Sequence, residues 1–183
     1  MTAPTILVVF HTAEGHTAQI ADRVADVLRA GGAIVDVRSA EGRPSASGYA
    51  GVVLGDSIHM GHHSKALRRY ALAEQPVLAA MPTALFQVSL SSANDDPGHR
   101  EDAEGYLRVF VEETGISPSA VGLFAGALAY TRYGWVKRRM LRSIARRAGL
   151  DTDVRHDHVY TDWDAVDRFA EDVLAQVQGA TRA

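Results

Sequence analysis

A short apolar run near the N-terminus, followed by a polar turn and a helical pattern, most strongly limits the fold of this chain. The run Thr5-Ile-Leu-Val-Val-Phe10 is continuous rather than alternating, which is typical of a strand buried on both faces of a parallel sheet. After the turn His11–Thr17, Ile20, Val24 and Leu28 recur at helical spacing. This strand–turn–helix start predicts an α/β protein with a parallel sheet covered on both sides.

The rest of the chain repeats this alternation. Further strands are predicted at 33–37, 51–54, 83–88 and 120–125, and further helices at 64–72, 102–113 and 164–177. In the helix at 102–113 we expect Tyr106, Val109 and Phe110 to face inward, and the spacing of Thr161 and Asp164 predicts an N-cap pair for the last helix.

Composition and charge limit the class of protein further. The 183 residues are 46% hydrophobic and contain no cysteine, which suits one globular domain and excludes disulfides and thiolate metal sites. Seven basic residues and no acidic one lie between Arg132 and Arg147, which leaves 12 basic against 22 acidic residues elsewhere. This layout favours a specific anionic partner for the basic segment and argues against nucleic acid. No run approaches about 20 apolar residues, so we expect a cytoplasmic protein without a membrane span.

The turn after the first strand is suited to a phosphate. It lies at a helix N-terminus, where free amides and the helix dipole attract anions, and Thr12 and Thr17 add hydroxyl donors. It contains neither the Gly-x-Gly-x-x-Gly pattern of dinucleotide folds nor the Gly-Lys-Ser/Thr of P-loop enzymes. Thr17 could instead simply cap the helix, and Glu14 is unfavourable beside a phosphate unless it points away. The predicted phosphomonoester loop comprises Thr12, Ala13, Glu14, Gly15, His16 and Thr17.

Loops after other strands mix apolar side chains with hydroxyls and glycines, as a flat amphipathic ring such as the isoalloxazine of FMN requires. Because ligands of open parallel sheets bind beyond the carboxyl ends of the strands, these loops are expected to meet there. The residues predicted to hold the cofactor ring are Ser57, Ile58, His59, Ser89, Leu90, Ser91, Gly126, Ala127 and Tyr130.

The histidines after the third strand admit several interpretations. His59, His62 and His63 suggest a metal, but no cysteine or carboxylate completes a convincing ligand set, so no metal is predicted. His59 and His62 remain candidate catalytic residues that assist proton movement. Solvated or ring-contacting histidines are the alternative.

Four segments together resemble a known family. Thr12-Ala-Glu-Gly-His-Thr17 resembles the flavodoxin phosphate signature. Ser57-Ile-His-Met-Gly-His62, Gly126-Ala-Leu-Ala-Tyr-Thr-Arg-Tyr-Gly-Trp135 and Val159-Tyr-Thr-Asp-Trp163 resemble the bacterial menaquinone-dependent protoporphyrinogen IX dehydrogenases. The similarity extends from about Ile6 to Val173, although the Asn94–Gly98 stretch departs from relatives in which it is basic.

The resemblance implies a single flavodoxin-like domain over 1–183, built as a three-layer sandwich with a five-stranded parallel sheet of order 2-1-3-4-5 and a basic helical insertion at about 127–155. It also implies an FMN-dependent oxidoreductase that oxidises protoporphyrinogen IX, or a related large hydrophobic substrate, with a quinone as acceptor. Two alternatives are a flavodoxin-type electron carrier and an NAD(P)H-dependent quinone reductase.

The basic insertion has an amphipathic pattern with three interpretations. An apolar arc that includes Met140 and Ile144 opposes a cationic arc, so a helix here could lie on an anionic membrane at the inner face of the cell membrane. The same arginines could bind porphyrin propionates, or the helix could simply be solvated. The predicted substrate or membrane contacts are Arg132, Tyr133, Trp135, Arg138, Arg139, Arg142 and Arg146.

Overall fold

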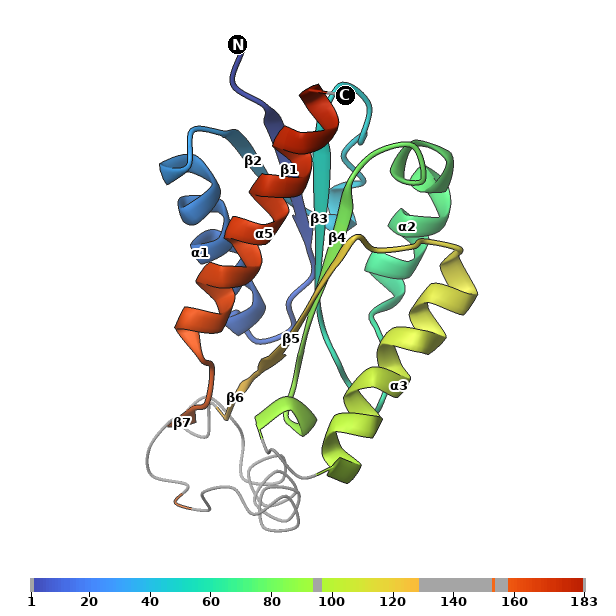
Figure 1. The fold of residues 1–183 in the computed structure, drawn as a ribbon. Helices are drawn as coiled ribbons and strands as arrows, with labels where there is room; N and C mark the ends of the chain where they lie inside the picture. Colours follow the sequence, from blue (N-terminus) through green and yellow to red (C-terminus); the bar gives the residue numbers. More distant parts are fainter. Residues whose placement is uncertain (1, 94–96, 129–152, 154–157, 183) are drawn as a thin grey trace.

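The chain folds into three layers, with a parallel sheet between two pairs of helices (Figure 1). The computed structural model describes residues 2–93, 97–128, 153 and 158–182. The strands of the main sheet are β1 (Thr5–Phe10), β2 (Ile34–Ser39), β3 (Gly51–Ser57), β4 (Thr83–Ser89) and β5 (Ala120–Ala125), in the order β2-β1-β3-β4-β5. All neighbours in this sheet are parallel, which confirms the predicted architecture and strand order.

Helices α1 (His16–Ala30) and α5 (Trp163–Arg182) cover one face, and α2 (Lys65–Leu78) and α3 (Pro97–Thr114) cover the other (Figure 1). Successive side chains of a strand point to opposite faces, so β1 supplies Ile6 and Val8 to the core beneath α1 and α5, and Leu7 and Val9 to the core beneath α2. Both cores are apolar, which explains why the first strand is a continuous apolar run.

Two short elements accompany the predicted insertion. β6 (Ala127–Leu128) and β7 (His158–Val159) pair antiparallel as a two-stranded ribbon outside the main sheet. This small second sheet was not predicted. Two single-turn 3-10 helices, η1 (Ala40–Gly42) and η2 (Ser91–Ala93), follow β2 and β4.

Two local predictions were wrong. Val109 is 43% exposed, because the buried stripe of α3 passes through Ala103, Phe110 and Thr114 and leaves Val109 at its margin. The cap of α5 is Asp162, whose Oδ1 accepts a hydrogen bond of 3.1 Å from the amide of Ala165. Thr161, in the short connection between β7 and α5, donates instead to the carbonyl of Ala125 at the end of β5.

An aromatic cluster holds α5 against the sheet. The rings of Phe86, Phe124 and Phe169 lie 5.6 to 6.2 Å apart between centroids, two of the three pairs edge to face. Gly55 on the neighbouring strand β3 makes room for this cluster, since a Cβ there would overlap the ring of Phe86.

We therefore expect Gly55→Ala to lower the free energy of unfolding by about 1–3 kcal/mol, because the overlapped ring is buried and has nowhere to move. Gly179→Ala is the matched control, since a Cβ at this helical position meets nothing within 4 Å. It should raise the free energy of unfolding by roughly 0.5–1 kcal/mol through helix propensity. Urea unfolding measures both, and equal effects of the two substitutions would contradict the assigned packing.

Candidate flavin site at the carboxyl edge of the sheet

The turn between β1 and α1 presents an open helix N-terminus. Gly15 is the N-cap residue in the left-handed conformation, with φ of +92°, and no side chain caps the helix. The first turn of α1 contains no acidic residue. The hydroxyl oxygen of Thr12 accepts a hydrogen bond of 2.9 Å from the amide of Gly15, so its hydrogen is available to a ligand. This terminus has the positive dipole end and the donors that a phosphate requires.

His16 connects this turn to the end of the sheet. Its Nε2 lies 2.7 Å from the hydroxyl oxygen of Thr161, which itself donates to the carbonyl of Ala125 at 2.7 Å. Because the only hydroxyl hydrogen of Thr161 goes to that carbonyl, Nε2 of His16 is the donor. The imidazole also meets the ring of Trp163 edge to face, with 6.1 Å between centroids. Burial lowers the pKa of His16, against a smaller opposing effect of Gln19.

The tyrosine–threonine–aspartate–tryptophan motif is therefore a structural junction. Tyr160 donates its amide to the carbonyl of Gly126 at 3.2 Å, which extends the β6–β7 ribbon toward the sheet. Thr161 and Trp163 contact His16, and Asp162 between them caps α5. In this way the motif joins the base of the insertion, the last helix and the phosphate-type turn.

A buried carboxylate organises the opposite side of the same edge. Asp56 is fully buried and accepts hydrogen bonds from the amides of Ser57 at 3.0 Å and Ser64 at 2.7 Å. Its two oxygens each lie 3.3 Å from a histidine nitrogen, Oδ1 from Nδ1 of His11 and Oδ2 from Nδ1 of His63. Burial raises the pKa of Asp56, but the interactions with both histidines outweigh it and hold the pKa below its ordinary value.

The two histidines around Asp56 differ in setting. His63 is buried, stacks in a tilted geometry on Phe110 and places its Nε2 3.2 Å from Oε1 of Gln87. Gln87 in turn donates to the carbonyl of Ala103 at 2.6 Å, which anchors the network to α3. His11 is half-buried, and its interaction with Asp56 raises its pKa despite the opposing effect of burial.

The predicted ring-binding residues come together from three strand ends. Ser57 ends β3, and the amide of Ile58, the next residue, donates to the carbonyl of Val88 at 2.9 Å. The Ser57 hydroxyl is buried and has no hydrogen-bond partner within the described residues, so it can serve a ligand.

The other two strand ends are β4 and β5. Ser89 is buried with its hydroxyl 2.9 Å from that of Ser92, and Leu90 and Ser91 are half-buried beside it. The carbonyl of Ser89 accepts from the amide of Gly126 at 3.1 Å, and Ala127 follows as the first residue of β6.

His59 and His62 lie at the tip of the loop after β3. They exchange amide–carbonyl hydrogen bonds of 3.0 and 3.1 Å around Met60 and Gly61, which have φ of +51° and +80°. Both imidazoles are exposed, and Met60 between them is 98% exposed. Their catalytic role stays a prediction. Within the described residues no three His, Cys, Asp or Glu side chains are grouped as a metal site would need.

The remaining predicted site residues belong either to the phosphate loop or to the insertion. Ala13 is exposed, Glu14 is half-buried and Thr17 is buried within the predicted loop. Eight residues of the insertion lie outside the described part of the chain, namely Tyr130, Arg132, Tyr133, Trp135, Arg138, Arg139, Arg142 and Arg146. The described helices include none long and apolar enough to span a membrane.

Sequence reasoning missed the network around Asp56, although a signal was present. His11, Asp56 and Gln87 each follow an apolar residue two positions earlier that faces α2 or α3, so strand alternation places all three on that face. Their common position at the carboxyl ends of adjacent strands makes a polar cluster the expected result.

The fold and the open helix terminus at the first strand-to-helix turn together define a flavodoxin-type α/β protein. The family model described as a flavodoxin domain matches residues 7–155. Flavodoxin 2 from Bacillus cereus has the same fold, with a TM-score of 0.57, 15% identity and coverage of 96% of this chain and 99% of that one.

Two curated relatives are more similar in sequence. Protoporphyrinogen IX dehydrogenase [quinone] of Leishmania major is 37% identical over 177 residues, covering 94% of this chain and 76% of the relative. The Escherichia coli (strain K12) protein of the same name is 32% identical over 169 residues, covering 91% of this chain and 93% of the relative. The chain belongs to the flavodoxin family and, within it, to the group of these dehydrogenases. This membership implies a flavin cofactor, and the uncapped α1 terminus and the unpaired Ser57 hydroxyl fit one.

His11 and His16, at the two ends of the turn between β1 and α1, should change the free energy of unfolding with pH in opposite directions. His11 has a raised pKa, so its contribution is fully present below pH 6.5 and is lost as the pH rises through the folded-state value. His16 has a lowered pKa, so its contribution is present above pH 6.5 and is lost as the pH falls through the folded-state value.

We expect the destabilisation caused by His11→Asn to shrink from about pH 5 to about pH 8, and that caused by His16→Asn to grow over the same range. Urea unfolding of the wild type and both variants across this range provides the measurement. Parallel slopes for the two variants would show that one of the two environments is wrongly assigned.

Proposed function

We propose that the chain binds FMN at the carboxyl edge of the sheet and oxidises protoporphyrinogen IX with a quinone as electron acceptor. The observation that carries the proposal is the 37% identity, over 94% of this chain, to a protein named protoporphyrinogen IX dehydrogenase [quinone]. The alternatives of an electron carrier or a nicotinamide-dependent reductase lack a comparable observation.

The phosphate of FMN is assigned to the turn from Thr12 to Thr17. Amides at the N-terminus of α1 and the free hydroxyl hydrogen of Thr12 supply the donors, and the absence of lysine from the turn leaves the charge to the backbone and the helix dipole. His16 holds this turn at a constant distance from the end of β5 through Thr161. The turn is therefore positioned before the ligand arrives, which lowers the entropic cost of binding.

The ring of FMN is assigned to the strand ends beside this turn. Ser57 offers a buried hydroxyl, Ser89 and Gly126 are joined by a backbone hydrogen bond, and Ile58 and Leu90 supply apolar surface. When bound, the cofactor supplies two-electron redox chemistry. The protein binds and orients the reactants around it.

His59 and His62 are proposed to handle protons. Each two-electron step removes two electrons and two protons from the porphyrinogen, and one quinone is reduced to its quinol. The exposed imidazoles at the tip of the loop are the side chains assigned to accept and release such protons. The exposed Met60 side chain between them offers an apolar contact to a large hydrophobic substrate.

The proposed phosphate position predicts that Gly15→Ala weakens FMN binding by at least about tenfold, because a side chain at positive φ costs about 1–2 kcal/mol and displaces the donating amides. Gly32→Ala is the matched control, with the same φ of +92° at the other end of α1. Fluorescence titration of the apoprotein with FMN and with riboflavin separates the phosphate contribution. Loss of FMN preference over riboflavin in Gly15→Ala alone supports the assignment, and equal losses in both variants contradict it.

The proposed reaction predicts formation of fluorescent porphyrin when FMN-loaded protein receives protoporphyrinogen IX and menadione without oxygen. His59→Ala and His62→Ala should lower the rate of porphyrin formation at neutral pH. The control is His158→Ala, which removes an imidazole from the β6–β7 ribbon and should leave this rate unchanged. No porphyrin above the protein-free rate would refute the substrate. Menadione reduction that requires NAD(P)H and ignores the porphyrinogen would favour the reductase.

A further inference from the structure

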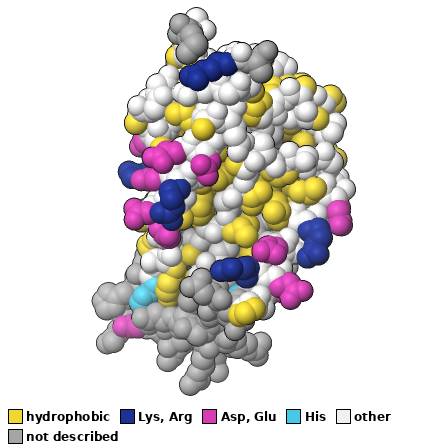
Figure 2. Space-filling model, in the orientation of Figure 1, with side chains coloured by type: hydrophobic (Ala, Val, Ile, Leu, Met, Phe, Trp, Pro, Cys, Tyr) yellow, Lys and Arg dark blue, Asp and Glu magenta, His cyan; other side chains and the backbone are white. Residues whose placement is uncertain are grey.

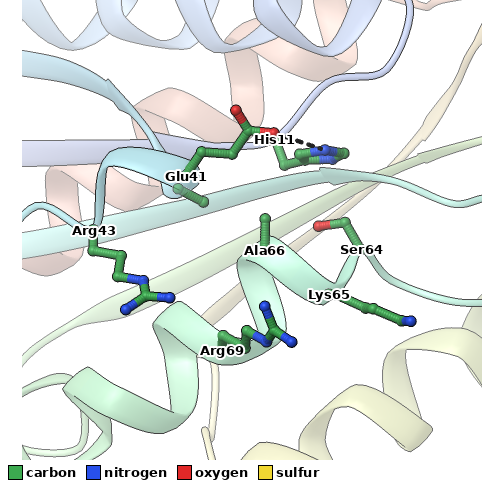
Figure 3. Close-up of a pocket in the computed structure, with 8 residues that line it drawn as sticks. His11, Glu41, Arg43, Ser64, Lys65, Ala66 and Arg69 are labelled. Carbon is green, nitrogen blue, oxygen red and sulfur yellow. Dashed lines mark ion pairs between the residues drawn. The ribbon is translucent and has the colours of Figure 1, made fainter.

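A pocket lies at the carboxyl edge of the sheet, on the face covered by α2. It has a volume of about 530 Å³ and lies between η1, the end of β1 and the N-terminus of α2. Figure 3 shows His11 on one side, Arg43 and Glu41 reaching in from η1 and its cap, and Ser64 and Arg69 on the α2 side. A volume of this size exceeds that of a single small ion and suits an organic molecule.

The pocket is strongly cationic and its cations are not neutralised. Arg43, Lys65 and Arg69 line it, and within the described part of the chain none of them forms an ion pair. Its one carboxylate, Glu41, is 73% exposed and lies 3.8 Å from Nε2 of His11. Three exposed cations against one exposed carboxylate around one cavity favour an anionic occupant.

The N-terminus of α2 adds to this positive potential. Ser64 caps the helix by accepting a hydrogen bond of 3.1 Å from the amide of Leu67, and no acidic residue lies in the first turn. The carboxylate of Asp56 already accepts the amide of Ser64 at 2.7 Å, so the amides of Lys65 and Ala66 are the donors that this terminus offers beside the arginines. The small Ala66 side chain keeps the space in front of this terminus open (Figure 3).

Arg43 is held in an unusual backbone conformation beside the pocket. It has φ of +47°, a region that side chains other than glycine, asparagine and aspartate rarely adopt, while its amide donates to the carbonyl of Ala40 at 3.2 Å. Strain of this kind persists where the surroundings impose it and is concentrated at ligand sites. It directs Arg43 across the cavity toward α2 (Figure 3).

We propose that this pocket binds a phosphorylated small molecule of about nucleotide size, with the phosphate between Arg43, Arg69 and the N-terminus of α2. Guanidinium groups from two elements form forked hydrogen bonds with phosphate oxygens, and a helix N-terminus adds amide donors. The pocket is separate from the predicted flavin phosphate turn, because α1 and α2 cover opposite faces of the sheet. The proposal goes beyond the proposed reaction and does not depend on it.

Calorimetric titration of the protein loaded with one equivalent of FMN, and of the protein without FMN, tests the proposal, since one equivalent fills only the proposed flavin site and the titration without FMN does not require that site. The probes are AMP, inorganic phosphate, adenosine and succinate. We expect AMP to bind at one site and more tightly than inorganic phosphate, with no heat from adenosine. The double variant Arg43→Gln/Arg69→Gln should weaken AMP binding by at least about tenfold, as expected for the loss of two charge-assisted contacts.

The matched control is Arg108→Gln/Arg182→Gln, which removes the same charge from exposed arginines outside the pocket. It should leave AMP binding unchanged, which separates the pocket from general electrostatic attraction. A second double variant, Arg43→Lys/Arg69→Lys, should retain part of the affinity and, like the wild type, lose it with rising salt.

Three results would overturn the proposal. They are no AMP binding to the protein with or without one equivalent of FMN, equal AMP affinity in the glutamine variant and the wild type, and succinate binding as tight as that of AMP. If the glutamine variant unfolds at a lower urea concentration than the wild type, the lysine variant and the wild-type salt dependence decide the outcome.

Discussion

The contacts of the buried Asp56 carboxylate hold together the carboxyl edge of the sheet, where the candidate site lies. A buried charge is costly unless it is paired and hydrogen-bonded, and Asp56 has two amide donors and two histidines around it. These partners come from the turn after β1, the end of β3 and the start of α2. One carboxylate therefore fixes the relative positions of three chain segments, including both turns that begin the helices α1 and α2.

The second organising contact lies on the other face. His16, at the first position of α1, meets Thr161 and Trp163 just before and at the start of α5, and Thr161 reaches the carbonyl of Ala125 at the end of β5. The ends of β1 and β5, which lie on opposite sides of β3 and β4 in the sheet, are thereby connected across its edge. The surface of the molecule near this edge includes exposed histidine and apolar side chains as well as charged ones (Figure 2).

Periodicity was sufficient to predict the main sheet, because a two-sided apolar core requires long apolar strands and amphipathic helices, and both patterns are strong in Thr5–Phe10 and 164–177. The β6–β7 ribbon was not predictable in this way, since two-residue strands have no measurable period. The turn from Thr12 to Thr17 was predicted from its residue types. The role of His16 was not, because its partner Thr161 is 145 residues away in the sequence.

The cap of α5 illustrates why local patterns fail at such junctions. Thr161 has the residue type and spacing of a cap, but the adjacent Asp162 caps the helix while Thr161 bridges His16 and Ala125. A hydroxyl that satisfies a strand-end carbonyl and a histidine stabilises three segments, whereas a capping hydroxyl stabilises one. Tertiary partners therefore decide the outcome between two residues of similar capping preference. The two helix N-termini at this edge differ for a simpler reason: the Ser64 hydroxyl is free of tertiary contacts and caps α2, while Gly15 has no side chain and leaves the amides of α1 open toward a ligand.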